Sequence, residues 1–407
     1  MNVLDLSRVL AGPYCTQVLA DLGARVVKIE PPRGDDTRDW GPPFAGDQSG
    51  YFLSVNRGKE SVAVDLKHPD GRRIVRRLAA RADVLVENFK VGDLARYDLA
   101  YDDLVGDAPG LIYASITAYG SDGPRAREPG YDAALQAVTG LMAMTGEPGG
   151  GPVKLGVAWI DVLTGLHAAV AILAALHDRD AGGGGRHLQL SLFETGLASL
   201  VNQAQGALLT GAPPVRLGSA HPSIVPYQAF DTADRPLMLA VGNDAQFARL
   251  CAVLEREAWA NEARFATNAA RVQNREALVP AVQERLRAGT RDDWLTRLHA
   301  AGVSCAPVND LPEALDDPQA RAMGTVGRYV HPTAGEVPYV RSPLRHGADG
   351  PDAAPPPRLG ADTRAVLEGE LGLGADEVTA LAEAGAVALL DDEAPAGDPA
   401  RGRGGGS

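Results

Sequence analysis

The chain has 407 residues, 45% of them hydrophobic and 22% charged, with a formal net charge of -13. This length allows two domains with separate cores. The acidic balance argues against a nucleic-acid-binding protein, because no basic surface large enough to cover a phosphate backbone is visible. The three cysteines lack the spacing of a disulfide framework or zinc site, and the N-terminus lacks a signal-peptide core, so we expect no metal and a reducing cytoplasm.

The N-terminal part predicts alternating strands and helices. Strands are expected over 3–6, 25–29, 61–66, 84–86 and 111–117, with helices over 12–22 and from Pro69 onward. This alternation is typical of an α/β fold with a doubly wound, mostly parallel sheet. Glu30 ends the second strand as in dinucleotide-binding folds, but the first turn lacks a G-x-G-x-x-G motif, so no NAD site is expected.

The longest apolar stretch follows a helix that is expected to begin near Tyr131. From 162 to 176 nearly every residue is aliphatic, which predicts a core helix enclosed by protein on most sides, shorter than the ~18 residues of a membrane span. Asp161 lies at its start, where free N–H groups and the helix dipole would keep the carboxylate ionised at neutral pH. Asp161 is either an ordinary helix cap or, behind the glycines at 149–151, a nucleophile for covalent catalysis.

The rest of the chain predicts a smaller domain and then a return to strands and helices. A strand over 188–193 and a helix over 194–209 precede a change of composition near 211. The later elements expected are a hairpin over 227–230 and 237–241, helices over 245–257, 275–287 and 292–300, strands over 304–308, 326–330 and 336–341, a linker over 352–358, and helices over 361–371 and 375–384. The expected domains are a large domain (1–210), a small α+β domain (211–325), a return to the large domain (326–390) and a disordered tail (391–407).

Loops at the carboxyl ends of the strands should line the ligand crevice of such a sheet. They include the segment from Val64 to Lys67, the E-N-F stretch that ends at Phe89, and Arg96. Arg57, Lys67 and Arg96 can pair with phosphates, and Phe89 can stack on a base. Each of these residues can equally be a surface charge or a core aromatic.

Several segments occur together along nearly the whole chain. They are V-L-D-L-S-R-V-L-A-G-P, A-D-L-G-A-R-V-V-K-I-E-P-P, N-R-G-K-E-S-V-A-V-D-L-K, E-N-F followed by Arg96, P-G-Y-D, the segment around Asp161, H-P-S-I-V-P-Y-Q-A-F, A-V-G-N-D and P-V-N-D. In these segments the chain resembles the class III coenzyme A transferases, the family of formyl-CoA transferase and carnitine-CoA transferase. The resemblance implies a large Rossmann-like domain built from both ends of the chain, a small inserted domain, and two chains interlocked as rings in a homodimer.

The resemblance also implies the site residues. Asp161 corresponds to the nucleophile, and a loop that closes over the acyl-enzyme corresponds to Gly242 and Asn243, although the family's run of glycines is missing here. Pro31 occupies the position of a family arginine near the adenosine diphosphate. The implied coenzyme A contacts are Leu10, Ala11, Val64 to Lys67, Asn88, Phe89 and Arg96, with Tyr131 and Asp132 near the acyl end. Coenzyme A is then a substrate, and no permanently bound cofactor is implied.

The implied reaction is stepwise acyl transfer through an aspartyl anhydride and an aspartyl-CoA thioester, with N–H donors from the glycine-rich turns and the helix start. An α-methylacyl-CoA racemase of the same fold is the alternative, but those enzymes carry G-H-D where this chain has Gly130-Tyr131-Asp132. A phenol with a pKa of about 10 is a poor general base. A non-catalytic coenzyme A-binding protein is a further alternative. The H-P-S-I-V-P-Y-Q-A-F and G-N-D stretches favour succinyl-CoA as donor and a small dicarboxylate such as glutarate as acceptor.

Overall fold

The computed structural model describes residues 1–344 and 354–390. The expected tail at 391–407 and the first two residues of the expected linker at 352–358 lie outside the described residues. Contacts divide the chain into two compact units. The large unit comprises Met1–Gly140, Leu155–Gln205 and Gln319–Ser407, and the small unit comprises Leu141–Lys154 and Gly206–Pro318.

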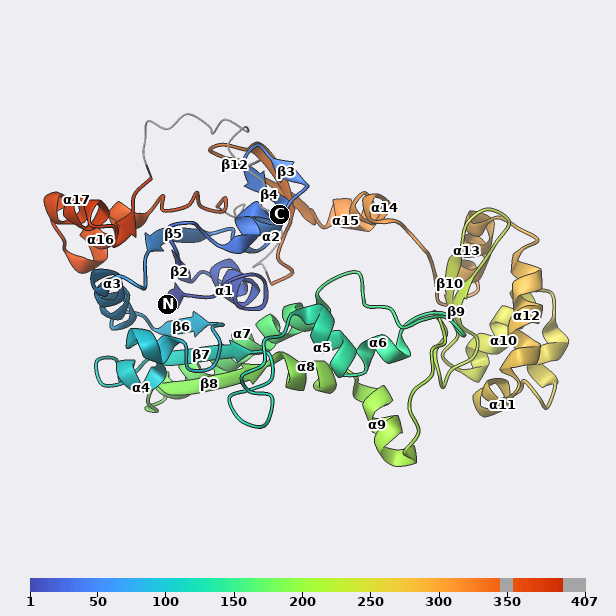
Figure 1. Cartoon of the computed structure of the whole chain (residues 1–407). Coiled ribbons are helices and arrows are strands. Elements are labelled where there is room, and N and C mark those ends of the chain that lie inside the picture. The colour runs from blue at the N-terminus through green and yellow to red at the C-terminus, as the bar shows by residue number, and fades with distance from the viewer. Residues whose placement is uncertain (345–353, 391–407) are drawn as a thin grey trace, which may run out of the picture. The chain divides into compact units, whose positions relative to one another are not determined.

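A seven-stranded sheet with the order β14-β5-β2-β1-β6-β7-β8 forms the centre of the large unit (Figure 1). Only β14 runs antiparallel to its neighbour, so the predicted α/β fold with a mostly parallel sheet is confirmed. The chain changes direction between β5 and β6, which places a topological switch point between β1 and β6. The strands are β1 (Asn2–Asp5), β2 (Arg25–Glu30), β5 (Lys59–Val64), β6 (Val84–Glu87), β7 (Ile112–Thr117), β8 (Arg186–Ser191) and β14 (Val387–Ala388).

Helices cover both faces of this sheet, because its strands carry apolar side chains on both sides. On β1, for example, Val3 belongs to one buried cluster and Leu4 to the other. One face packs against α1 (Ala11–Asp21), α5 (Asp132–Val138), α7 (Trp159–Asp180) and α8 (Leu192–Ala198). The other packs against α3 (Pro69–Ala79), α4 (Tyr101–Leu104), α16 (Thr363–Leu371) and α17 (Ala375–Glu383).

The central helix α7 differs from its prediction in length and in burial. It has 22 residues, and Val170 and Leu173 on its surface are 66% and 40% exposed, so the expectation of a helix enclosed on most sides is wrong for the single chain. Among the described residues it is the one helix long and apolar enough to cross a membrane by length and composition. It nevertheless packs tightly on α1, since a Cβ added to Gly165 would lie 2.6 Å from the Ala11 carbonyl oxygen.

The two elements expected directly after α7 also have different bounds. The strand expected over 188–193 ends at Ser191, because the Ser191 hydroxyl accepts the Glu194 N–H (3.1 Å) and caps α8. The helix expected over 194–209 is divided into α8 and α9 (Val201–Thr210). The division lies where Val201 adopts a φ of 34°, outside the helical range.

The small unit contains a three-stranded antiparallel sheet with the order β11-β10-β9. The predicted hairpin is confirmed as β9 (Tyr227–Phe230) and β10 (Leu237–Ala240). Its core includes Phe230, Leu239, Phe247, Leu250 and Trp294. The other elements are α6 (Leu141–Met144), α10 (Asp244–Val253), α11 (Asn268–Gln273), α12 (Arg275–Leu286), α13 (Arg291–Ala300), β11 (Cys305–Pro307) and α14 (Leu311–Leu315).

A smaller cluster in the large unit joins segments far apart in the sequence. Leu53 packs with Tyr329 and Val337. These residues lie on α2 (Gly50–Val55) and on the hairpin of β12 (Val326–His331) and β13 (Gly335–Val340), beside β3 (Phe44–Ala45) and β4 (Gln48–Ser49) (Figure 1). The short helix α15 (Pro318–Ala322) precedes this hairpin.

Candidate active site

The loops after β1 and β6 meet at the switch point of the sheet. The Arg8 N–H donates a hydrogen bond to Asn88 Oδ1 (2.8 Å), and Asn88 Nδ2 donates one to the Arg8 carbonyl oxygen (2.7 Å). This reciprocal pair joins the two loops. Asn88 therefore shapes the crevice in addition to lining it.

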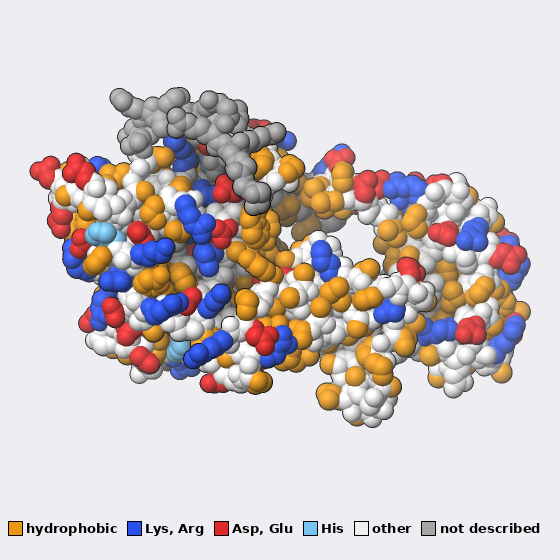
Figure 2. Space-filling model, viewed as in Figure 1, with side chains coloured by type: hydrophobic (Ala, Val, Ile, Leu, Met, Phe, Trp, Pro, Cys, Tyr) orange, Lys and Arg blue, Asp and Glu red, His pale blue; other side chains and the backbone are white. Residues whose placement is uncertain are grey.

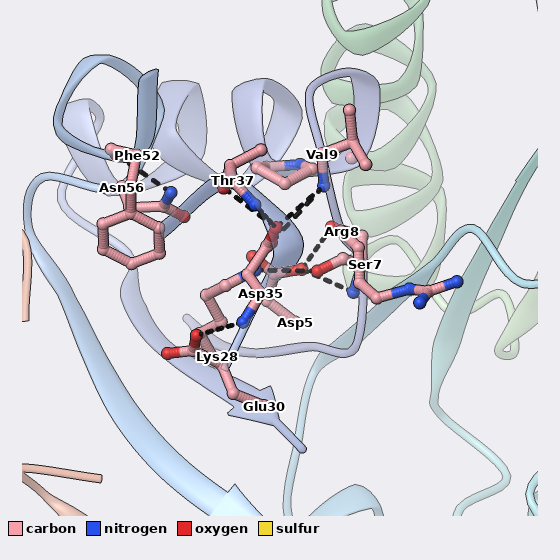
Figure 3. Close-up of polar contacts among 12 residues, drawn as sticks. Asp5, Ser7, Arg8, Val9, Lys28, Glu30, Asp35, Thr37, Phe52 and Asn56 are labelled. Carbon is pink, nitrogen blue, oxygen red and sulfur yellow. Dashed lines mark hydrogen bonds and ion pairs between the residues drawn. The ribbon is translucent and has the colours of Figure 1, made fainter. Parts of the chain in front are cut away.

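A cluster of buried charges lies beneath the loop after β1 (Figure 3). Lys28 Nζ donates to the Ser7 carbonyl oxygen (2.8 Å) and pairs with Asp35 Oδ2 (3.0 Å). Asp5 accepts the Ser7 N–H (2.9 Å) and pairs with Lys59 Nζ (3.1 Å). Burial alone would raise the pKa of Asp5, but Lys59 and Lys28 outweigh burial and hold this pKa at about 2. The loop after β1 therefore rests on a cluster of buried, ionised side chains.

The loop itself is strained at Val9, whose φ is 68°. A β-branched residue in this left-handed region costs about 1–3 kcal/mol. The Val9 N–H faces Asp35 Oδ2 at 3.3 Å, while the Arg8 side chain points away from the buried cluster (Figure 3). The strained turn places Leu10 and Ala11 at the start of α1. No side chain caps this helix, and its first turn contains no acidic residue.

The start of α7 is stabilised by Asp132 from the neighbouring helix α5. Asp132 Oδ1 accepts the N–H groups of Ile160 (2.8 Å) and Asp161 (3.2 Å), and Gln136 holds its other carboxylate oxygen (2.5 Å). Asp132 is itself buried. The expectation that the helix start would donate to Asp161, or to a reaction intermediate, is therefore wrong for these two N–H groups.

This arrangement raises the pKa of Asp161. Burial, and then the nearby charge of Asp132, raise that pKa to about 7, and the described residues make no hydrogen bond to the carboxylate that would offset this effect. The expectation of a fully ionised Asp161 at neutral pH is therefore wrong. Burial and the same two carboxylates also raise the pKa of Tyr51 to about 12, so this phenol stays protonated and can donate a hydrogen bond.

Asp161 lines a cavity of 340 Å³ in the large unit, which we call the active-site cavity. Tyr131, 68% exposed, also lines it. The other expected residues in its wall are Leu10, Ala11, Asn88 and Phe89. The structure thus brings six of the expected residues together around one cavity.

A second cavity of 420 Å³, which we call the nucleotide cavity, shares Arg8 and Phe89 with the active-site cavity. Its floor is apolar, and the expected segment from Val64 to Lys67 forms part of its wall. Arg8, Arg33 and Lys67 supply positive charge. An apolar lining bordered by cations fits a nucleotide with phosphates.

Glu30 also lines the nucleotide cavity, but its carboxylate is engaged elsewhere. Its two oxygens accept hydrogen bonds from Arg38 (2.7 and 2.8 Å), and Ser61 Oγ donates a further one (2.7 Å). A ribose-binding carboxylate needs free oxygens. The NAD interpretation therefore gains no support from the position of Glu30.

A comparison with known proteins decides the family. The family model described as CoA-transferase family III matches residues 1–363. The chain belongs to CoA-transferase family III. It is 43% identical over 370 residues to the succinyl-CoA:glutarate CoA-transferase of Mus musculus, covering 90% of this chain and 85% of that protein. It is 44% identical over 351 residues to the succinate-glutarate CoA-transferase of Agrobacterium fabrum, covering 84% and 88%.

A solved structure agrees with this assignment. The crystal structure of a CAIB/BAIF family protein from Brucella suis matches with a TM-score of 0.80 at 42% identity, covering 91% of this chain and 98% of that one. The protein is therefore a family III CoA-transferase, an enzyme that takes acyl-CoA as substrate.

Four of the expected residues of this CoA-transferase line neither cavity, and one of them, Asp132, is buried against the start of α7. Arg96 is exposed, pairs with Asp93 and lines neither cavity. Gly242 and Asn243 belong to the small unit, where the Asn243 side chain accepts the Gln246 N–H (2.9 Å) and caps α10. Arg57, a candidate for phosphate, is buried and pairs with Asp21 (2.6 Å).

Two arginines that line these cavities were not predicted from the sequence as site residues. Arg8 lies in the quoted N-terminal motif but was not singled out, and Arg33 follows Pro31 by two positions. Both line the nucleotide cavity together with Pro31, which the resemblance placed at the position of a family arginine. The sequence did offer a signal for Arg33, because this arginine lies two positions after Pro31.

Proposed function

We propose that this CoA-transferase moves coenzyme A from succinyl-CoA to a small dicarboxylic acid such as glutarate, with Asp161 as the covalent nucleophile. The position of Asp161 carries the proposal. Its carboxylate lines a cavity that continues, through Arg8 and Phe89, into a cavity suited to a nucleotide. The names of the relatives, which specify succinyl-CoA and glutarate, support the choice of acids.

In the proposed reaction the ionised Asp161 attacks the thioester carbon of the donor, and the coenzyme A thiolate leaves. The product is a mixed anhydride between Asp161 and the donor acid. The thiolate then attacks the Asp161 carbonyl, which releases the donor acid and leaves an aspartyl-CoA thioester. The acceptor carboxylate attacks this thioester, and the thiolate finally attacks the acceptor carbonyl, which gives the new ester and free Asp161.

The thiolate and the tetrahedral intermediates need stabilisation of negative charge. Because Asp132 engages the N–H groups at the start of α7, we assign this role to the start of α1 instead. Leu10 and Ala11 line the active-site cavity there, and no side-chain cap or acidic residue competes for their N–H groups. An uncapped helix N-terminus favours an anion.

The wall of the active-site cavity favours transfer over racemisation. A racemase needs a second acid-base group that faces the substrate α-carbon. No histidine is among the residues that line this cavity, and Tyr131 occupies the position of the racemase histidine. A phenol has a pKa of about 10 and is a weak base at neutral pH.

We propose that two chains form the homodimer implied by the family, interlocked as rings. Exposed apolar side chains support this. Val170 on α7 is 66% exposed, and Leu208 and Leu209 on α9 are 81% and 77% exposed. Such side chains are typical of surfaces that another chain covers. We also propose a cytoplasmic location without a membrane anchor or a permanently bound cofactor, consistent with three free cysteines.

The proposed function is tested by incubating the enzyme in D₂O with succinyl-CoA, a chiral 2-methylacyl-CoA and a panel of free dicarboxylates, followed by mass spectrometry of the coenzyme A esters. Formation of a dicarboxyl-CoA at the expense of succinyl-CoA is the expected result. Asp161→Ala should abolish it while coenzyme A still binds. Deuterium in the 2-methylacyl ester without exchange of coenzyme A would instead identify a racemase.

A further inference from the structure

Glu87 is a buried carboxyl group to which the proposed mechanism gives no role. It ends β6, opens the E-N-F segment (residues 87–89) and is only 7% exposed. Lys and Arg side chains gather on the surface of the large unit that Figure 2 shows. No Lys, Arg or His side chain pairs with Glu87, however, in the part of the chain that the structure describes. A buried carboxylate without a counter-charge lowers stability, so packing alone does not account for this residue.

The missing counter-charge affects the acidity of Glu87. Burial raises its pKa to about 7, and hydrogen bonding by the Ser115 hydroxyl and the Phe89 N–H opposes this rise. Ser115 lies beside Glu87 in the register of β6 and β7. Its Oγ lies 2.8 Å from Nε2 of His187 on β8, and the His187 ring stacks on Tyr101 with centroids 5.1 Å apart. Side chains from three neighbouring strands therefore hold the carboxyl group in place.

Glu87 in turn holds the backbone of Phe89. The Phe89 N–H donates a hydrogen bond to Glu87 Oε2 (2.7 Å). Asn88, between them, is fixed to Arg8 by the reciprocal pair of hydrogen bonds. The path of the chain from β6 into Phe89 is thus set by one side-chain carboxyl group.

Phe89 lines three cavities at once. They are the nucleotide cavity, the active-site cavity and a third cavity of 160 Å³, which we call the rear cavity. Glu87, Ser115 and His187 line the rear cavity as well. Open space on that side leaves Phe89 less confined by packing. The hydrogen bond from its N–H to Glu87 therefore carries more of the task of keeping Phe89 in place.

We propose that Glu87 is a positioning residue that holds Phe89 as the wall shared by the two cavities of the acyl-CoA ester. The inference rests on the proposed function and adds Glu87 to it, with Ser115 and His187 as supports. Glu87 lines neither of those two cavities, so it acts through Phe89. A wall that contacts the ester equally in the ground state and the transition state lowers KM without changing kcat. Glu87 therefore sets the affinity for the ester and takes no part in the chemical steps.

The test is a double-mutant cycle on Glu87 and Phe89, with initial rates measured at pH 8. Glu87→Ala removes the acceptor of the Phe89 N–H. It should raise KM for succinyl-CoA about tenfold, as expected for one hydrogen bond to a charged group, and leave kcat nearly unchanged. Phe89→Ala should raise KM at least as much. Because Glu87 acts through Phe89, adding Glu87→Ala to Phe89→Ala should raise KM little further.

Glu87→Gln is the conservative variant of this cycle. Its amide oxygen can still accept the Phe89 N–H, so it should recover most of the KM lost in Glu87→Ala. Thermal unfolding of each variant shows whether the fold is intact. Glu87→Leu replaces Glu87→Ala in the cycle if the alanine variant does not fold, because leucine fills similar space without an acceptor.

Tyr113→Phe is the matched control. Tyr113 lines the same rear cavity from β7, and its hydroxyl donates a buried hydrogen bond to the Leu99 carbonyl oxygen (3.0 Å), outside the E-N-F segment. Loss of this bond should leave KM unchanged. Additive increases in KM for Glu87→Ala and Phe89→Ala, or an equal increase in Tyr113→Phe, would overturn the inference.

Calorimetric titration of the same variants with free coenzyme A separates this inference from the proposed function, since binding needs no transfer. The losses of affinity should again be non-additive. Non-additive losses in a protein that does not transfer coenzyme A would refute the proposed function and leave the role of Glu87 standing. Additive losses in an active transferase would do the reverse.

Discussion

Asp161 and Asp132 lie at the same helix start but have different partners. Asp132 accepts two backbone N–H groups and a glutamine, whereas Asp161 faces the active-site cavity. The anion stabilised by the helix terminus is therefore Asp132, and its charge raises the pKa of its neighbour. At the scale of single residues, one carboxylate fixes the helix start and the other lines the cavity, where we propose that it reacts.

The raised pKa of Asp161, about 7, predicts the pH dependence of transfer. Only the ionised carboxylate can attack the thioester, so kcat/KM for succinyl-CoA should fall about tenfold per pH unit below about pH 7. An ordinary aspartate, with a pKa of about 4, would cause this loss only in strong acid. Initial rates measured across the pH range check the prediction.

Asp132→Asn is the matched variant for this pH profile. The amide oxygen can still accept the N–H groups of Ile160 and Asp161, but the like charge is gone, so the acid limb should move to lower pH. Asp178→Asn, at the other end of α7, should leave the limb in place. An unshifted limb in Asp132→Asn would show that Asp132 does not set the pKa.

Asp161→Asn should be inactive yet more stable than wild type. Because the folded pKa of Asp161 is raised above the unfolded value, the carboxylate lowers stability increasingly as the pH rises from about 4 to about 7. The amide removes this cost, so the free energy of unfolding at pH 8 should increase by about 1–3 kcal/mol. The gain should vanish near pH 4. Denaturant titrations at both pH values measure it, and a loss of stability at pH 8 would contradict it.

The sequence predicted Asp161 and Tyr131 as site residues, because each lies within a local motif, and both line the active-site cavity. It could not assign Asp132 to the start of α7, because that contact joins two helices separated by the whole 141–154 segment. Nor did it reveal Arg8 and Arg33 as partners in one cavity. Their proximity depends on how the loops after β1 and β2 fold against each other.

At the scale of elements, the loop after β1 is held by the ion pairs beneath it. Lys28, which lies on β2, donates a hydrogen bond to the Ser7 carbonyl oxygen and pairs with Asp35. Asp35 in turn faces the N–H of the strained Val9. This loop carries Arg8 and leads to the start of α1, so the position of the active-site cavity depends on a buried lysine outside that cavity.

Lys28→Met should therefore destabilise the fold strongly. Removal of Lys28 leaves Asp35 buried without its counter-charge and leaves Asp5 with Lys59 alone, and breaking such a buried pair typically costs about 3–5 kcal/mol. Arg33→Met is the control, because its pair with Asp36 is exposed, and such pairs contribute about 1 kcal/mol or less. Urea unfolding of both variants provides the measurement. Equal stabilities would mean that the buried cluster does not hold the loop.

Element types were more predictable than element ends. The parallel strands follow from runs of β-branched residues between helices, and six of the seven strands of the large sheet were expected. The break between α8 and α9, before Val201, was not expected. The sequence remains apolar across it, and only the backbone conformation changes. β14, two residues long, is too short to carry a recognisable pattern.

At the scale of the whole molecule, the C-terminal elements complete the large unit. β14 pairs with β5 at the edge of the sheet, and α16 packs against α3 and β5. Val366, Leu367 and Val378 are fully buried there. The family resemblance predicted that both ends of the chain build the large domain, but composition alone offered no reason to join them.

A chain ending at residue 358 should therefore fail to fold. It lacks α16, α17 and β14, and so one face of the sheet loses two of the four helices that cover it and the edge strand beside β5. We expect aggregation, or a circular dichroism spectrum without a cooperative thermal transition. A chain ending at residue 390 retains every described element and should melt like the full chain. Cooperative melting of the shorter chain would contradict this role of the C-terminal helices.

Covalent capture on Asp161 is the most direct test of the proposed mechanism. The enzyme is incubated with succinyl-CoA, quenched with hydroxylamine and digested with trypsin. The peptide after Lys154, which ends at Arg179, contains only two carboxylates, Asp161 and Asp178. We expect hydroxamate on Asp161, dependent on succinyl-CoA and absent when it is omitted. Active transfer with the adduct on another residue, or with none on this peptide, would contradict Asp161 as the nucleophile.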